Sequence, residues 1–356
     1  MTEQPKLTVL QQVYLELLEH DHEAIREEAV KQLIDIIDAD VVEVLAERIQ
    51  DDNFSGMLEA IWLLGKAEAT QVTETLIERF QEEKDPQLRE VIAGAFAEMG
   101  DVRALQVLID ALEDSNPNVQ DAAAIALGEM RDSRAIKPLI QRLKPPHYQA
   151  IAGWALALIG DKRAIKPLTN TLLQAPDESV RGMAARSLGK MGHPDADQAV
   201  IVGLEDRDDN VLIEVIRVIG ERQLEQFLPE MENLFEHSDS ERVKLAIAVA
   251  MSRCGQGENY KIYLCHVLKS DPDWGARLSA LIGLRQMPYE EVETHLRKAL
   301  EDEHWLVQKV AARSLLELQD TMLYEALEEL LGDEEEDIMQ AVIESSFFEL
   351  LENSDD

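Results

Sequence analysis

Hydrophobic and small residues return at a regular spacing along most of this chain. The pattern Val-x-x-x-Ala-Ala-x-x-Leu is clearest at Val119–Leu127, Val180–Leu188 and Val307–Leu315. We call its Val position the Val slot and use it as a ruler. Neighbouring slots lie 29 to 33 residues apart, at Ile25, Gly56, Leu88, Val119, Tyr148, Val180, Val211, Val243, Ala276, Val307 and Ile338. A period of this size predicts a solenoid, whose repeats bury their apolar faces only against one another.

Within one repeat, the hydrophobic spacing predicts two helices. In residues 115–144, a turn is followed by a helix that begins near Val119 and carries small and aliphatic residues on one face. A second helix begins near Ala135, with Pro138 in its first turn, where a missing N–H costs little. Strand signals are nearly absent. We therefore expect an all-α fold, an α-α superhelix of about ten helical-hairpin repeats.

Composition and charge narrow the range of partners. The 356 residues include 71 acidic and 34 basic ones, a formal net charge of −37. This charge disfavours nucleic acid and anionic membranes, because both require a basic surface. It would attract a basic protein, although such charge also keeps a chain soluble. Two cysteines form no disulfide framework, and no signal peptide or transmembrane run is visible, so we expect a cytoplasmic protein.

Several repeat units resemble a known family. The segments VRGMAARSLGKMG (180–192), DSRAIKPL (132–139) and DKRAIKPL (161–168) are similar to HEAT repeats of the short type named after phycobilisome lyases. In that family VRxxAAxALG is followed by a Gly-Asp turn and AIxxLxxxL. The resemblance weakens after Val211, where Gly220-Glu221 and then Gly255-Gln256 replace Gly-Asp. It implies a HEAT-like solenoid, a fold that does not itself specify a function.

Three regions are predicted along the chain. Residues 1–20 would form an N-terminal capping helix, residues 21–333 the HEAT-like repeat solenoid, and residues 334–356 an acidic C-terminal capping half-repeat. Apolar residues of the last segment would seal the final core layer, because a solenoid requires polar caps. A second interpretation is that its acidic side chains attract a basic partner.

The chain lacks the sequence patterns of catalysis. Deoxyhypusine hydroxylase, a relative of this repeat family, holds two irons with His-Glu pairs two and three residues after the Val slot. No such position here is His-Glu, and the dipeptide His22-Glu23 precedes its slot. Phosphate-binding loops, GxSxG and HExxH motifs are also missing. We therefore expect no hydroxylase activity and no enzyme of these classes.

Two groups of residues are candidate metal ligands. His20 and His22 lie in an acidic turn, which is more typical of solvated residues. Cys254, Cys265 and His266 form a cluster of soft ligands that would still need a fourth ligand. Free cysteines are usually small buried hydrophobes. We expect no cofactor and no metal.

The strongest candidate for function is the concave side of the solenoid. Residues two, three and six positions after each Val slot should line it, and many of them are apolar: Leu58, Trp62, Val91, Ile125, Ile151, Trp154, Met183, Ile213, Leu245, Val249, Leu278 and Ile282. Such a surface suits an amphipathic helix or loop of a partner. The alternative is that these side chains pack between repeats. That alternative is weaker for Trp62 and Trp154, because an aromatic on a repeat surface often anchors a partner.

We therefore predict a non-enzymatic scaffold, adaptor or assembly factor that holds a protein partner in its concave groove. The partner would be basic or present an amphipathic helix. Two alternatives stay open: a phycobilin lyase-like factor, with Trp154, Tyr148 and Arg186 around a tetrapyrrole, and an accessory protein of iron or iron–sulfur cofactor assembly that uses the two cysteines. The predicted contact residues are Trp62, Trp154, Met183 and Ile213, with an acidic rim of Glu59, Glu90 and Asp121.

Overall fold

The structure, a computed structural model, describes residues 5–144 and 150–317 and is helical wherever it shows regular secondary structure. The chain divides into two compact units, Met1–Ala199 and Val200–Asp356. The sequence predicts no boundary at this point. Each unit is described by itself below.

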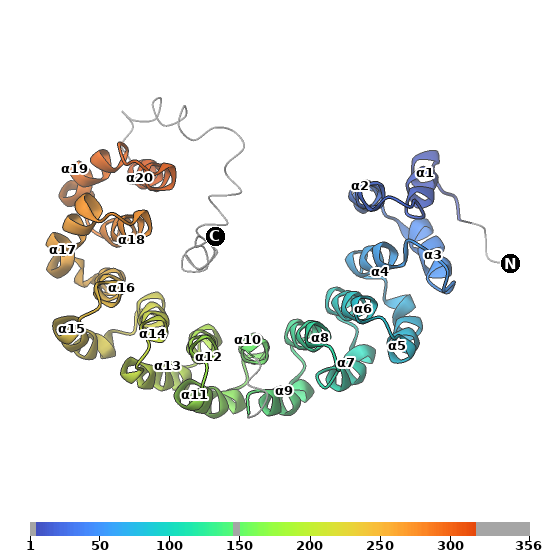
Figure 1. The fold of residues 1–356 in the computed structure, drawn as a ribbon, viewed down its shortest axis with the longest axis horizontal. Helices are drawn as coiled ribbons and strands as arrows, with labels where there is room; N and C mark the ends of the chain where they lie inside the picture. The colour runs from blue at the N-terminus through green and yellow to red at the C-terminus, as the bar shows by residue number, and fades with distance from the viewer. Residues whose placement is uncertain (1–4, 145–149, 318–356) are drawn as a thin grey trace. The chain divides into compact units, whose positions relative to one another are not determined.

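Unit 1 is a stack of helical hairpins. Figure 1 shows the even-numbered helices side by side in an inner row, with the odd-numbered helices outside them, and each inner helix packs against the next. The spacing of small and aliphatic residues predicts these hairpins correctly. The helices are α1 (Val9–Leu17), α2 (Glu23–Ile34), α3 (Ala39–Arg48), α4 (Met57–Lys66), α5 (Thr73–Glu82), α6 (Pro86–Met99), α7 (Leu105–Ala111), α8 (Pro117–Glu129), α9 (Ile136–Arg142), α10 (Ala150–Ile159), α11 (Ile165–Gln174) and α12 (Glu178–Met191).

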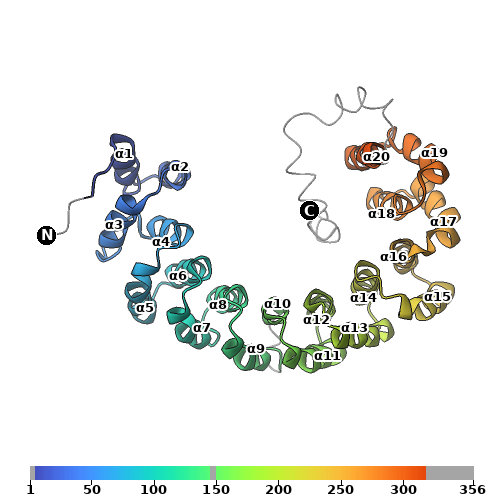
Figure 2. The same ribbon diagram turned by 180° about the vertical axis from the view of Figure 1, so that it is seen from behind.

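Unit 2 repeats this arrangement. Figure 2 shows α14, α16, α18 and α20 as its inner row, and these helices pack against one another in sequence. A short π-helical segment, Ser252–Gln256, joins α16 to α17. Helix α13 (Pro194–Val200) ends where unit 2 begins. The remaining helices are α14 (Asp209–Glu221), α15 (Leu228–His237), α16 (Glu241–Met251), α17 (Gly257–Ser270), α18 (Trp274–Leu284), α19 (Tyr289–Ala299) and α20 (Trp305–Glu317).

Helix starts follow directly from local sequence. Asp85 and Asn116 precede α6 and α8, and the side chain of each accepts a hydrogen bond from a backbone amide of the first turn. Pro86 and Pro117 occupy the next position, where a missing N–H leaves no bond unmade. Asp177 caps α12 in the same way. These caps place the start of each inner helix within its repeat.

Small residues set the distance between inner helices. A Cβ built at Gly128, nine residues after its slot, would lie 2.8 Å from the Cα of Ala155 on α10. A Cβ built at Gly65 would likewise lie 2.9 Å from the Cα of Ala95 on α6. Because real Cβ atoms do not approach so closely, these glycines allow the helices to pack against each other at short range.

The inner helices α4, α6, α8, α10, α12, α14 and α16 are each followed by a left-handed residue twelve positions after the slot. Four of these residues are glycines, including Gly100 and Gly160, whereas Glu68, Arg131 and Gln223 have φ of 50°. The sequence interpretation of Gly220-Glu221 as a turn was wrong. Gly220 lies inside α14, where it packs against Ala250. The left-handed residue that ends this helix is Gln223, which is not a glycine.

We expect Arg131→Gly to raise the free energy of unfolding by about 1 kcal/mol, because glycine adopts this backbone without the steric cost of a Cβ. Gly160→Ala, at the same position with φ of 71°, should lower it by a similar amount. Urea unfolding of both variants measures the difference. Equal stability of the two variants would contradict this assignment.

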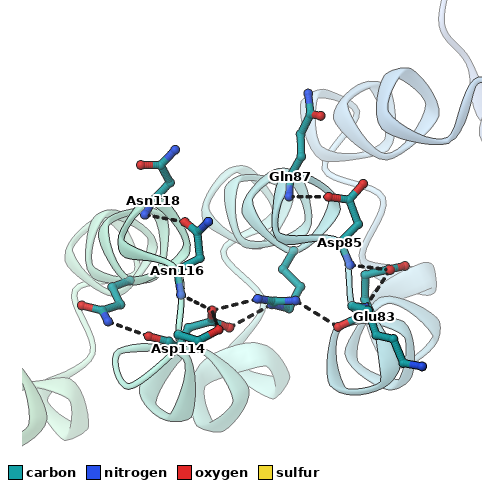
Figure 3. Close-up of polar contacts among 10 residues, drawn as sticks. Glu83, Asp85, Gln87, Asp114, Asn116 and Asn118 are labelled. Atoms are coloured by element: carbon teal, nitrogen blue, oxygen red, sulfur yellow. Dashed lines mark hydrogen bonds and ion pairs between the residues drawn. The ribbon is translucent and has the colours of Figure 1, made fainter.

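Arginine side chains that are largely shielded from solvent connect consecutive repeats. Arg89, one residue after its slot, donates through Nε and a terminal nitrogen to both carboxylate oxygens of Asp114, each at 2.8 Å, and to the carbonyl of Glu83 at 3.0 Å. Figure 3 shows Asp114, Asn116 and Glu83 around this site. Arg277 binds Asp302 and the carbonyl of Asp271 with the same geometry in unit 2.

Asp114 stays ionised in this partly buried site. Burial alone would raise its pKa, but hydrogen bonds from Arg89 and from the Asn116 amide hold the pKa below its usual value. The side chains of Arg89 and Asp114 are only 11% and 12% exposed. The pair therefore acts as an internal connection between two repeats, and sequence analysis did not identify it.

Candidate protein-binding surface

The inner row of unit 1 presents an apolar surface, which we call the inner face of unit 1. It consists of the positions two, three and six residues after each Val slot on α4, α6, α8, α10 and α12. None of the predicted apolar residues here is fully buried. Trp62 and Ile125 are 40% and 37% exposed, and the others are half-buried: Leu58, Val91, Ile151, Trp154 and Met183.

An open space lies in the middle of this face. Trp62, Gly94 and Ile125 occupy the same position, six residues after the slot, on the neighbouring helices α4, α6 and α8. Gly94 is exposed, and a Cβ built on it would have no neighbouring atom within 4 Å. Gly94 therefore leaves the surface of α6 bare between α4, which carries the exposed Trp62, and α8, which carries the exposed Ile125. Sequence analysis did not single out Gly94.

Lysine side chains cover part of both tryptophans. The Lys66 ammonium lies 5.6 Å from the centroid of Trp62 and also pairs with Glu98 on the next inner helix. The Lys190 ammonium of α12 lies 5.3 Å from the centroid of Trp154 on α10. At these distances each ammonium group is attracted to the face of the indole.

The three predicted rim acids differ in their surroundings. Glu59 pairs with Arg26 of α2 at 2.6 Å, and its side chain is only 15% exposed, so this carboxylate serves the contact between repeats. Glu90 is half-buried on α6, and Asp121 is exposed on α8. Of the three residues, Asp121 is the one that the structure leaves exposed.

The predicted contact residue Ile213 does not lie on the inner face of unit 1. It lies on α14 in unit 2 and is 3% exposed, so its side chain is part of the core there. Leu245 and Leu278, at the equivalent position of α16 and α18, are also buried. The alternative interpretation, packing between repeats, therefore holds for these three residues, and we leave Ile213 out of the inner face of unit 1.

The candidate ligands for cofactors are scattered. Within residues 5–144 and 150–317, no three His, Cys, Asp or Glu side chains come together as a possible metal site. Both thiols are free, and burial raises the pKa of Cys254 and of Cys265. Tyr148, expected to contact a bilin, lies outside the described residues.

The inner row of unit 2 carries a cluster of ion pairs instead. Arg217 of α14 pairs with Glu214 at 2.7 Å and with Glu221 at 2.8 Å, while Arg253 is 3.8 Å from the same Glu221. Burial lowers the pKa of Arg253, and the Glu221 carboxylate opposes part of this shift. Arg217 and Arg253 therefore share the Glu221 carboxylate.

Both units are stacks of helical hairpins with an inner and an outer row of helices. This architecture defines the class of α-solenoid proteins. A sequence model of HEAT repeats matches residues 11–95, 73–150, 138–212, 198–285 and 263–346, and the chain belongs to the HEAT-repeat family. The resemblance seen in the repeat units is thereby confirmed. A comparison with curated proteins found no match.

Solved structures share the fold. A crystal structure of importin beta aligns with 90% of this chain and 54% of its own, with a TM-score of 0.58 and 15% identity. The complex of CpcE and CpcF of phycocyanin lyase from Nostoc aligns with 61% of this chain and 92% of its own, with a TM-score of 0.39 and 24% identity. At these identities the likeness concerns the fold alone. No described helix has the length and apolar character needed to cross a membrane.

Proposed function

We propose that this chain is a protein-binding scaffold that holds a partner segment on the inner face of unit 1. The observation that carries this proposal is that three adjacent inner helices carry the exposed Trp62, the bare surface at Gly94 and the exposed Ile125 at the same position. A monomeric soluble protein rarely exposes large apolar side chains in a row unless they bind something. The spacing of these residues on adjacent helices suits an amphipathic helix or loop.

The charge around this face favours a basic partner. Glu90 and Asp121 are both accessible to solvent beside it, and the whole chain carries a net charge of −37. Charges at the edge of an interface act mainly by steering the encounter. The partner would therefore carry apolar anchors among basic residues, and the complex would form in the cytoplasm.

Trp62→Ala should weaken binding of the partner about 30-fold, because an aromatic anchor is worth about 2 kcal/mol. The melting temperature should change little, since the ring is already 40% exposed. The partner is first captured on the immobilised wild-type chain from an extract of the native host and identified by mass spectrometry. Its affinity for each purified variant is then measured by titration calorimetry.

Two variants make this test specific. Gly94→Met should fill the open space and weaken binding while the fold is kept, because methionine is a good helix former and meets no neighbour there. Leu173→Ala removes an exposed apolar side chain from α11, on the outer row of the same unit, and should bind like wild type. Equal affinity of wild type, Trp62→Ala and Gly94→Met would refute the proposed surface.

A further inference from the structure

One part of unit 1 is basic in a chain that is otherwise acidic. In sequence, residues 133–176 contain seven basic residues and a single acidic one, Asp161. In the whole chain, by contrast, 71 of the 356 residues are acidic and only 34 are basic. The described helices of this stretch are α9, α10 and α11. A local reversal of charge on this scale calls for a physical explanation of its own.

Two turns bring the positive charge to one edge of unit 1. Residues 131–135 lead from α8 to α9, and residues 160–164 lead from α10 to α11. Both turns connect an inner helix to an outer one, and the second turn packs against α9, the neighbour of α11 in the outer row (Figure 1). Six basic side chains on or just after these turns are exposed. We call them the basic edge: Arg131, Arg134, Lys137, Lys162, Arg163 and Lys166.

Most of this charge is available to a ligand. Arg134 and Arg163 each donate through Nε and one terminal nitrogen to the aspartate two residues earlier, Asp132 or Asp161, at 2.7–3.0 Å. The other four side chains of the basic edge form no hydrogen bond or ion pair within residues 5–144 and 150–317: Arg131, Lys137, Lys162 and Lys166. The exposed Glu129, at the end of α8, can offset at most one of them. The basic edge therefore keeps an excess of positive charge.

We propose that the basic edge binds an acidic segment of a protein partner. Its two turns belong to neighbouring repeats, whose helices pack about 8–10 Å apart. Three residues of an extended chain span about 10 Å, so carboxylates at that spacing would reach both turns. Lys137 and Lys166 occupy the same position in the two repeats and would pair with successive carboxylates. Charge complementarity of this kind selects a partner and speeds its association.

The flanking repeats favour a short acidic segment over a nucleic acid. In the preceding repeat, the position of Arg134 is held by Arg103, which pairs with Asp101 and Glu74. In the following repeat, the same position is the exposed Asp195. A nucleic-acid strand that crossed the basic edge would continue over these acids, where its phosphates find no excess of positive charge. An acidic peptide can end there. This inference does not depend on the function proposed for the inner face of unit 1.

Binding of a fluorescein-labelled peptide of ten glutamates to the full-length chain tests the proposal. Fluorescence anisotropy measures the affinity in about 50 mM NaCl. K137Q/K162Q/K166Q should bind the peptide about tenfold more weakly than wild type, because three exposed charge pairs are lost. The variant should keep its helical content by circular dichroism, since these side chains form no ion pair in the described chain. In about 0.5 M NaCl the difference should disappear.

A matched variant separates the basic edge from the overall charge. K31Q/K84Q/K269Q removes three exposed lysines elsewhere, changes the net charge by the same amount and should bind the peptide like wild type. A labelled single strand of ten thymidines should bind wild type more weakly than the peptide does. Three results would overturn the proposal: no binding of the peptide to wild type, an equal affinity of wild type and K137Q/K162Q/K166Q, or tighter binding of the thymidine strand. An equal loss in both triple variants would overturn it as well.

Discussion

Arg89→Ala should lower the free energy of unfolding by about 3 kcal/mol, the largest single effect that we expect. The substitution leaves the Asp114 carboxylate buried without its two hydrogen bonds from the guanidinium, and breaking a buried pair on one side typically costs 3–5 kcal/mol. In a unit of this size the melting temperature should fall by about 6–12 °C. Calorimetry and urea unfolding monitored by circular dichroism measure the loss.

An exposed pair provides the control. Arg134 binds Asp132 at 2.7 Å, but its side chain is 60% exposed, so Arg134→Ala should lower the stability far less than Arg89→Ala. The double variant R89A/D114A removes both charges and should be less destabilised than the sum of the two single variants. Equal losses for Arg89→Ala and Arg134→Ala would show that the buried pair does not connect the repeats.

The second prediction concerns the replacement of glycine by alanine, which we expect to change the stability in opposite directions at two positions. Gly128→Ala should destabilise the chain by about 2 kcal/mol, because the new Cβ would lie 2.8 Å from Ala155 and push α8 from α10. Gly94→Ala should stabilise it by about 0.5–1 kcal/mol, because alanine is the better helix former and meets no neighbour. Urea unfolding of both variants is the measurement, and effects of the same sign would contradict the packing described for Gly128.

Much of the fold could be predicted from the sequence because close packing of the inner helices requires particular residue types at fixed positions of the repeat. Alanine and glycine recur where inner helices approach closely, and leucine recurs where they fill the core, as at Ala123 and Leu127. The turn after α14 was missed for an equally physical reason. Gln223 adopts the left-handed conformation without being glycine, so composition gave no signal there.

The candidate surface was harder to predict because exposure depends on neighbours far along the chain. Leu58 and Leu278 occupy the same position after their slots, yet the first is half-buried and the second fully buried. Glu59 looks like a surface acid until its partner, Arg26, is placed beside it by the stacking of α2 on α4. Gly94 contributes to the surface because it has no side chain. A search of the sequence for side chains that bind a partner does not identify such a position. Whether Trp62, Trp154, Met183, Glu90 and Asp121 bind a partner remains a prediction.

The ion pairs between repeats have a consequence for synthesis of the chain. Arg26–Glu59, Lys66–Glu98, Arg89–Asp114 and Arg277–Asp302 each join residues only 25 to 33 positions apart. At about 5–20 residues per second, a ribosome adds that length in roughly one to seven seconds. A newly made repeat therefore receives its charge partner from the next repeat within seconds, long before the C-terminal residues are translated. The repeats can therefore fold in the order in which they are synthesised. At any time only the most recently made repeat lacks its neighbour.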